Sequence, residues 1–225
     1  MVTTGENTSV LIEINDLYFD YGRRPVLNGL SFCFHKGERV GLIGPNGSGK
    51  TTLFHIVMGL LRPAAGELKI FGKSRNKEKD FLEVRRRIGF VFQDPDDQLF
   101  SPTVAEDIAF GPLNLGIPRE QVMKIVSDTL SMLGLEGFEN RITHKLSGGE
   151  KRLVSVATVL AMNPDVLLLD EPTSGLDEKT VKRLSDILNS LNTSYIIASH
   201  DRDFLKQVTG KLYQMNHGQL VLIED

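Results

Sequence analysis

Hydrophobic residues alternate with polar ones in the first part of the chain. Over about the first seventy positions, turn residues separate the strand-like runs LIEINDLYFDY, VLNGLSFCFHKGE, RVGLIG and, after a helix-like segment, GELKIFG. Lys36 and Gly37 predict a hairpin-like turn. The highly charged segment 73–87 predicts a solvated loop or helix face.

The apolar spacing changes to a helical period between Val104 and Met162. Two short, continuous apolar runs follow, DVLLLDE and SYIIASHD, with the helix-like KTVKRLSDILNSL between them. Continuous apolar runs are typical of buried parallel strands, and the order strand, helix, strand predicts a right-handed crossover. The pattern therefore predicts an α/β core that is interrupted by a helical insertion.

Composition limits how the chain can meet a membrane or a nucleic acid. Its 225 residues are 40% hydrophobic and carry a formal net charge of -3, so no polycationic field attracts nucleic acid. A single cysteine, Cys33, excludes an internal disulfide and fits a reducing compartment. The N-terminal MVTTGENTSV is polar rather than signal-like, and the longest apolar run, LVSVATVLAM, is about half of a membrane span. Any membrane role is therefore expected to come through a partner.

The segment GPNGSGKT, Gly44 to Thr51, follows a strand-like run and opens a helix-like one. This is the phosphate-loop pattern, in which small residues let backbone N–H groups surround phosphate oxygens at a helix N-terminus. Lys50 supplies a positive charge for the outer phosphates, and the Thr51 hydroxyl suits Mg²⁺. The flanking strand and helix disfavour the alternative of a chance glycine turn.

The run DVLLLDE ends in two adjacent carboxylates at the C-terminal edge of a predicted strand, where ligands bind in open α/β sheets. Asp170 is predicted to hold Mg²⁺ through its water shell, and Glu171 to polarise an attacking water. The alternative is that Glu171 only caps a turn before Pro172.

The segment LSGGEKRLVSVATVLAM predicts a second helix N-terminus that binds an anion. Ser147 is a good N-cap, two glycines expose backbone donors, and the following helix has one apolar face. One chain thus carries two predicted phosphate-binding segments.

Over nearly its whole length the chain resembles the nucleotide-binding subunits of ABC (ATP-binding cassette) transporters. The resemblance rests on the ordered motifs GPNGSGKT, Gln93, LSGGE, LLLDE, SGLD and His200. It implies an α/β fold: a P-loop ABC ATPase core with an N-terminal antiparallel β-subdomain and an inserted α-helical subdomain. Residues 1–225 would form a single domain, with the core at about 1–93 and 164–225 and the helical subdomain at about 94–163.

In that family two cassettes pack head to tail, and the LSGGE of one closes over the ATP of the other. The resemblance implies that Tyr21 stacks on adenine, that Glu171, His200 and Lys50 are catalytic, and that Asp177 crosses the interface. Ordinary core packing is the alternative for Tyr21. The implied magnesium ligands are Thr51, Gln93 and Asp170. The implied nucleotide contacts are Tyr21, Gly44, Pro45, Asn46, Gly47, Ser48, Gly49, Lys50, Thr51, Thr52, Gln93, Ser147, Gly148, Gly149 and Asp177.

The sequence departs from the family pattern at Glu150, where glutamine is more usual, and at Glu178, where proline is common. Neither residue is expected to touch a phosphate contact. His35, His55, His144 and His217 match no motif and are predicted to be structural or superficial.

Three classes of protein compete for this motif set. LSGGE and SGLD argue against a P-loop kinase or other NTPase. The chain shows neither the long coiled coil of DNA-repair ABC ATPases nor the fused second cassette of translation factors, and it has no basic stripe. A transporter ATPase without a nucleic-acid partner is therefore favoured over a soluble non-transport ABC ATPase.

The segment FQDPDDQLFSPTVAEDIAFGPLNLG resembles the ATPases of energy-coupling-factor importers, particularly the cobalt and nickel group. This implies a transmembrane coupling protein that docks near Gln93–Phe100, a separate substrate-binding membrane component, and a peripheral location on the cytoplasmic face of the membrane. An apolar groove rimmed by Asp94, Asp96 and Asp97 would receive a basic amphipathic helix. The alternative is a solvated acidic loop over a core Leu99 and Phe100.

The cargo and the second cassette remain open at this point. The acids are assigned to docking rather than to a cobalt or nickel site, and a vitamin such as biotin is the alternative cargo. The second cassette is an identical copy or a paralogue. The chain stops soon after KLYQMNHGQLVLIE, so a mostly monomeric apo protein is expected.

Overall fold

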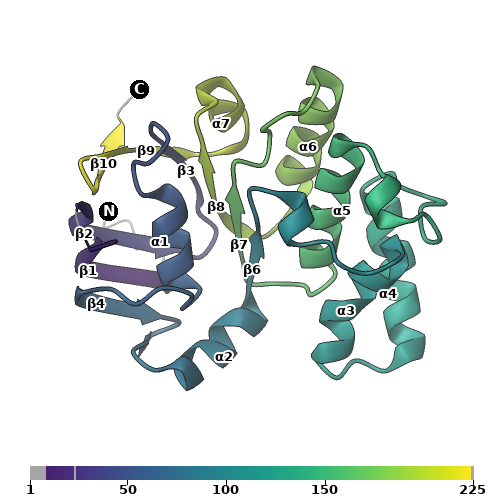
Figure 1. Ribbon diagram of the computed structural model, residues 1–225, viewed down its shortest axis with the longest axis horizontal. Coiled ribbons are helices and arrows are strands. Elements are labelled where there is room, and N and C mark those ends of the chain that lie inside the picture. Colours follow the sequence, from purple (N-terminus) through teal and green to yellow (C-terminus); the bar gives the residue numbers. More distant parts are fainter. Residues whose placement is uncertain (1–8, 23, 224–225) are drawn as a thin grey trace, which may run out of the picture.

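Two β-sheets lie side by side within residues 9–22 and 24–223, which are the residues that the computed structural model describes (Figure 1). The smaller sheet is antiparallel. Its strands, in spatial order, are β2 (Pro25–His35), β1 (Val10–Asp20), β4 (Ala65–Ile70) and β5 (Lys73–Ser74). The predicted strands of the first part of the chain are therefore confirmed.

The larger sheet is parallel from β9 to β6 and ends in one antiparallel edge strand. Its order is β10 (Gln219–Ile223), β9 (Lys211–Asn216), β3 (Arg39–Ile43), β8 (Ser194–Ser199), β7 (Val166–Asp170) and β6 (Ile88–Val91). Every residue of β7 and β8 is buried, and the two strands are parallel neighbours as the sequence predicts.

The helices connect these strands and cover the larger sheet. They are α1 (Lys50–Val57), α2 (Glu78–Arg87), α3 (Val104–Asn114), α4 (Arg119–Met132), α5 (Gly148–Leu160), α6 (Glu178–Ser190) and α7 (Arg202–Val208), with short 3₁₀ turns at η1 (Pro95–Asp97) and η2 (Thr143–Lys145). In Figure 1, α3, α4 and α5 lie together on the side away from the smaller sheet. The predicted helical insertion is present between β6 and β7, and the domain division proposed at residues 93 and 164 stays a prediction.

Two hydrophobic cores meet at the larger sheet, because successive strand side chains point to opposite faces. Leu167 and Leu169 of β7 pack into the core of α3 to α6. Val166 and Leu168 pack into the other core, with α1 and the antiparallel sheet. The end of β7 is consequently fixed from both faces.

Two details differ from the sequence-based expectations. Lys36 and Gly37 do not close a hairpin: the turn joins β2 of one sheet to β3 of the other, and the Gly37 N–H donates to Ser194 Oγ at 2.8 Å. The charged segment 73–87 is not wholly solvated. Arg75 is buried there. Its guanidinium donates to the Ile70 carbonyl at 2.9 Å and pairs with the Glu83 carboxylate, and these partners offset the cost of burying its charge.

No helix among the described residues combines the length and apolarity that crossing a bilayer requires. The first eight residues, on which the prediction about a secretory signal mainly falls, lie outside the described residues.

Strand β6 approaches α5 closely at Gly89. A Cβ atom at Gly89 would overlap Val159 Cγ1 of α5 and lie 3.2 Å from Leu167 Cδ2. Because interiors are close-packed, the position permits only hydrogen there. This contact sets the distance between α5 and the segment that β6 leads into, which begins at Phe92.

Gly89→Ala should therefore lower the free energy of unfolding by about 1–3 kcal/mol, because the added methyl forces α5 or β6 to shift. Urea denaturation followed by circular dichroism measures this. Gly210→Ala is the matched control, since the nearest atom to its new Cβ is 4.0 Å away. Equal stability of the two variants would contradict the prediction.

Candidate functional site

The loop Gly44–Gly49 joins β3 to the N-terminus of α1. Gly47 and Gly49 have φ angles of 77° and 109°, in the left-handed region that glycine adopts at no steric cost. The buried Lys50 ammonium folds back across the loop and donates to the carbonyl of Gly44 at 2.7 Å. The loop thus has the conformation and the cation that a phosphate group requires.

A cavity of about 520 Å³ lies over this loop. It is lined by Tyr21, Val26, Asn46, Gly47, Ser48, Gly49, Lys50, Thr51, Thr52, Gln93 and Glu171. Gly44 and Pro45, which were also predicted to contact the nucleotide, do not line this cavity. Their carbonyl oxygens accept hydrogen bonds from the Lys50 ammonium. The alternative that Tyr21 is ordinary core is wrong: its side chain is 64% exposed, with its hydroxyl 3.3 Å from Thr52 Oγ1.

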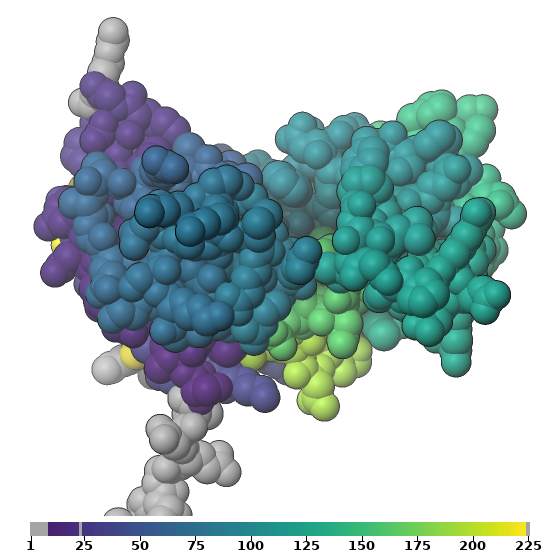
Figure 2. Space-filling model, turned by 90° about the horizontal axis from the view of Figure 1, so that it is seen from below, coloured from purple at the N-terminus to yellow at the C-terminus, as the bar shows by residue number. Residues whose placement is uncertain are grey.

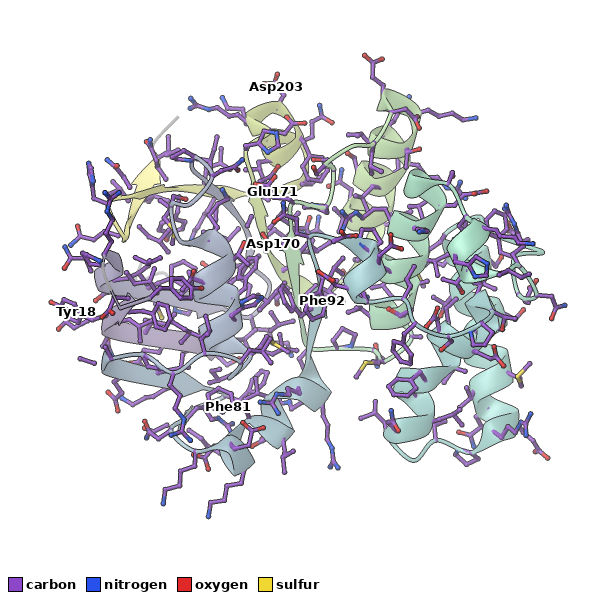
Figure 3. The ribbon with its side chains drawn as sticks, in the orientation of Figure 1. Tyr18, Phe81, Phe92, Asp170, Glu171 and Asp203 are labelled. Carbon is purple, nitrogen blue, oxygen red and sulfur yellow. The ribbon has the colours of Figure 1, made fainter. Side chains whose placement is uncertain are left out.

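Asp170 and Glu171 stand at the C-terminal end of β7, above Phe92 at the end of β6 (Figure 3). Asp170 is 1% exposed, and neither of its carboxylate oxygens has a hydrogen-bond partner within the described part of the chain. Burial raises the pKa of Asp170, which the nearby Thr51 hydroxyl and Lys50 partly oppose. A buried carboxylate without a donor, beside a threonine hydroxyl, fits a hard divalent cation such as Mg²⁺.

Glu171 has a φ of 44°, which is uncommon for a residue with a side chain and aims the carboxylate back over the loop. Its Oε1 lies 3.5 Å from Lys50 Nζ. Its Oε2 lies 2.8 Å from His200 Nδ1. The backbone carbonyl of Glu171 does accept from Ser174 in a turn, but the carboxylate takes no part in it. The side chain therefore contacts Lys50 and His200 and does not cap the turn before Pro172.

Gln93 lines a second cavity, of about 580 Å³, as well as the first. The second cavity is lined by Thr51, His55, Phe90, Phe92, Gln93, Asp94, Pro95, Asp97, Arg152, Asp170 and Ser174. Gln93, like Thr51, thus borders both the cavity over the loop and the cavity beside the acidic segment.

Two side chains not singled out from the sequence hold the Gln93 segment against α5. The buried Arg152 guanidinium donates to the carbonyl oxygens of Phe92, at 2.7 Å, and Gln93. Gln98 donates to Ser155 O at 2.7 Å and accepts from the Phe92 N–H at 3.1 Å. The sequence does hold a signal for Arg152: it lies four residues before Val156, and this spacing places a charged side chain on the apolar, buried face of the helix.

Ser147, Gly149 and Asp177 do not line the cavity over the loop, and Gly148 lines a different one, of about 280 Å³. Asp177 caps α6: its carboxylate accepts from the Thr180 N–H at 3.0 Å and the Thr180 hydroxyl at 2.9 Å, and both bonds lower its pKa. The predicted site residues therefore fall into two groups within one chain.

Glu150 was expected to touch none of the predicted phosphate-contacting residues, but it contacts one of them, Ser147. The Ser147 hydroxyl donates to Glu150 Oε2 at 2.9 Å, and the Glu150 N–H in turn points to Ser147 Oγ at 3.4 Å. The reason is position: a glutamate three residues after a serine N-cap completes a capping box.

Comparisons with known proteins agree with this geometry. The sequence model of the ABC transporter family matches residues 27–174. The energy-coupling factor transporter ATP-binding protein of Methanocaldococcus jannaschii is 48% identical over 216 residues, which cover 94% of this chain and 77% of that protein.

Solved structures give the same fold. CbiO1 from Clostridium perfringens, described as part of the ABC transporter complex cbiONQ, has a TM-score of 0.85 at 36% identity and covers 95% of this chain and 87% of its own. A dimeric ATP-binding cassette with ADP and Pi has a TM-score of 0.84 at 27% identity, over 93% and 96%. The predicted family, cassette fold and ATPase activity are confirmed. The chain belongs to the ABC transporter family, as an ATP-binding and ATP-hydrolysing subunit.

Proposed function

We propose that the chain energises an energy-coupling-factor importer from the cytoplasmic face of the membrane, with cobalt or nickel ions as cargo. The importer type is supported by the relative named as an energy-coupling factor ATP-binding protein. The cargo is supported by the resemblance of the segments DDQLF and FGPLNLG to the cobalt and nickel group. Vitamin importers share this ATPase design, so biotin is the alternative cargo.

Asp170, Thr51 and Gln93 would hold Mg²⁺, which when bound supplies positive charge to the phosphates of ATP. The Glu171 carboxylate would orient the attacking water and take up its proton. Lys50 would bind the outer phosphates, because among the described residues its ammonium contacts only the carbonyls of Gly44 and Pro45 and the Glu171 carboxylate. His200 is 64% exposed at its side chain, and so remains able to reach the terminal phosphate while it touches Glu171.

We also propose that a second cassette, an identical copy or a paralogue, completes the site head to tail. The separation of Ser147, Gly148, Gly149 and Asp177 from the cavity over the loop supports this arrangement. An isologous pair has two-fold symmetry and would form two equivalent sites. The dimeric relative with ADP and Pi gives further support.

The coupling protein is proposed to dock beside Gln93–Phe100, where the surface is hollowed between the part around α2 and that of α3 and α4 (Figure 2). Phe100 is 66% exposed and packs edge-to-face on Phe110, which is 48% exposed, with ring centroids 4.8 Å apart. The alternative of a core Phe100 is therefore wrong, whereas Leu99 is buried.

Asp94, Asp96 and Asp97, which were predicted to form one acidic rim, have different partners in the structure. Asp94 caps η1, and Asp96 pairs with Lys151 at 2.5 Å. The Asp97 carboxylate has no donor or cation partner among the described residues. A basic side chain of the docking helix would therefore meet Asp97, with an apolar side chain against Phe100.

Glu171→Gln should reduce ATP turnover by about 100- to 10,000-fold, because the amide keeps the shape of the side chain but cannot accept the proton. With ATP and Mg²⁺ the variant should accumulate as a dimer, which light scattering after size exclusion measures. Glu120→Gln, at the exposed start of α4, is the matched control and should turn over like the parent. A variant that stays monomeric with ATP and Mg²⁺ would contradict the dimer.

Replacing Asp97 and Phe100 by alanine should lower co-purification with the coupling protein, and uptake, by tenfold or more. ATP affinity, measured by calorimetry, should stay unchanged. Asp96→Ala is the control, because Lys151 already compensates that acid. Loss of ATP binding instead of docking would count against this surface.

The cargo is tested in cells that produce this chain together with a candidate coupling protein and a candidate substrate-binding membrane component. Cobalt or nickel should accumulate with the parent chain and fail to accumulate with Glu171→Gln. Biotin accumulation under the same conditions would overturn the proposed cargo and leave the ATPase role intact.

A further inference from the structure

We propose that Arg141 is a positioning residue for the ATP-closed dimer: it neutralises Glu150, the carboxylate that holds Ser147 of the LSGGE segment, so that phosphate can approach the Ser147 hydroxyl. The proposal rests on the head-to-tail dimer proposed above. It concerns a residue that lies outside every motif of the sequence.

The Ser147 hydroxyl is fixed by a single carboxylate oxygen. Oε2 of Glu150 accepts from the Ser147 hydroxyl at 2.9 Å and from the Ser147 N–H at 2.8 Å. The other oxygen, Oε1, accepts from Arg141 Nη1 at 2.6 Å. Glu150 therefore stands between the serine and the arginine and contacts both.

The carboxylate creates an electrostatic problem for phosphate binding. Its pKa is lowered, first by the Ser147 N–H and then by Arg141 and the Ser147 hydroxyl, so it is anionic at neutral pH. An anion in the first turn also offsets the positive end of the α5 dipole, which would otherwise attract phosphate. Without a cation nearby, Glu150 would repel the terminal phosphate from the hydroxyl that it holds.

Arg141 is held in place to supply that cation. Its guanidinium lies 4.2 Å from the centroid of the Phe138 ring. The backbone N–H of Arg141 donates to the Phe138 carbonyl at 2.9 Å, and the backbone carbonyl of Arg141 accepts from the Val104 N–H at 3.1 Å. The side chain is nevertheless 41% exposed, so the pair faces solvent where a second cassette would close. Arg141 thus fixes both the charge and the geometry at the N-terminus of α5.

The test measures ATP-dependent dimerisation in the Glu171→Gln background, where hydrolysis does not interfere. Arg141→Ala should weaken dimerisation at least tenfold. Adding Glu150→Gln to it should restore most of the loss, because the amide keeps an oxygen for Ser147 and carries no charge. Arg141→Lys, which keeps the charge, should dimerise nearly as well as the parent.

Two readouts separate this role from a structural one. The deficit of Arg141→Ala should shrink as salt rises from low to high concentration, because screening weakens repulsion between exposed charges. ATP binding by the monomer should be unchanged, since that cavity does not include Arg141 or Glu150. If Arg141→Ala proves unstable, Arg141→Gln replaces it and carries the same expectations.

Normal dimerisation of Arg141→Ala, or an Arg141→Ala deficit that Glu150→Gln does not relieve, overturns the proposal while the dimer itself stands. Failure of the Glu171→Gln parent to dimerise contradicts the proposed function, and this proposal falls with it.

Discussion

A buried group of opposite charges, with Lys50 at the start of α1 and Asp170 and Glu171 at the end of β7, constrains the structure around it. Lys50 reaches Glu171, Glu171 reaches His200, and Asp170 beside them has no hydrogen-bond donor among the described residues. Such a cluster is costly to bury unless an ion or ligand completes it. The two cores on either face of β7 supply the stability that keeps the carboxylates there. The proposed ligand, a phosphate group together with a divalent cation, would complete this cluster.

Arg152 and Gln98 link that site to the helical layer by hydrogen bonds. Their hydrogen bonds tie the carbonyl end of β6 to α5, whose N-cap is Ser147. Gly89 brings the same strand close to the same helix. Because packed interiors do not deform smoothly, a displacement of Gln93 would carry α5 with it. A ligand that moves Gln93 would accordingly move the LSGGE segment of the same chain.

The α/β core with its helical insertion was predictable because strand and helix periods are local, and the phosphate loop because its glycines meet a local backbone requirement. The cassette fold itself was predicted from the resemblance of the ordered motifs to the ABC family. Contacts between distant segments were not predictable in that way. Arg152 meets the carbonyl of Phe92 only after folding, and Arg141 reaches Glu150 across a turn with no periodic pattern. Asp94, Asp96 and Asp97 look alike in the sequence, yet a cap and an ion pair leave them with different capacities.

Two neighbouring parts of the helical layer would then have complementary tasks. In the proposed arrangement, Ser147 at the N-terminus of α5 would face a second cassette, and Phe100 and Asp97 would face a membrane partner. Both are joined to Gln93 through α5 and η1 rather than through the phosphate loop. Since any ligand shifts an equilibrium only by its differential affinity for two states, ATP must favour the arrangement in which α5 meets it. A docking surface that moves with α5 would make nucleotide binding and transport parts of one conformational change.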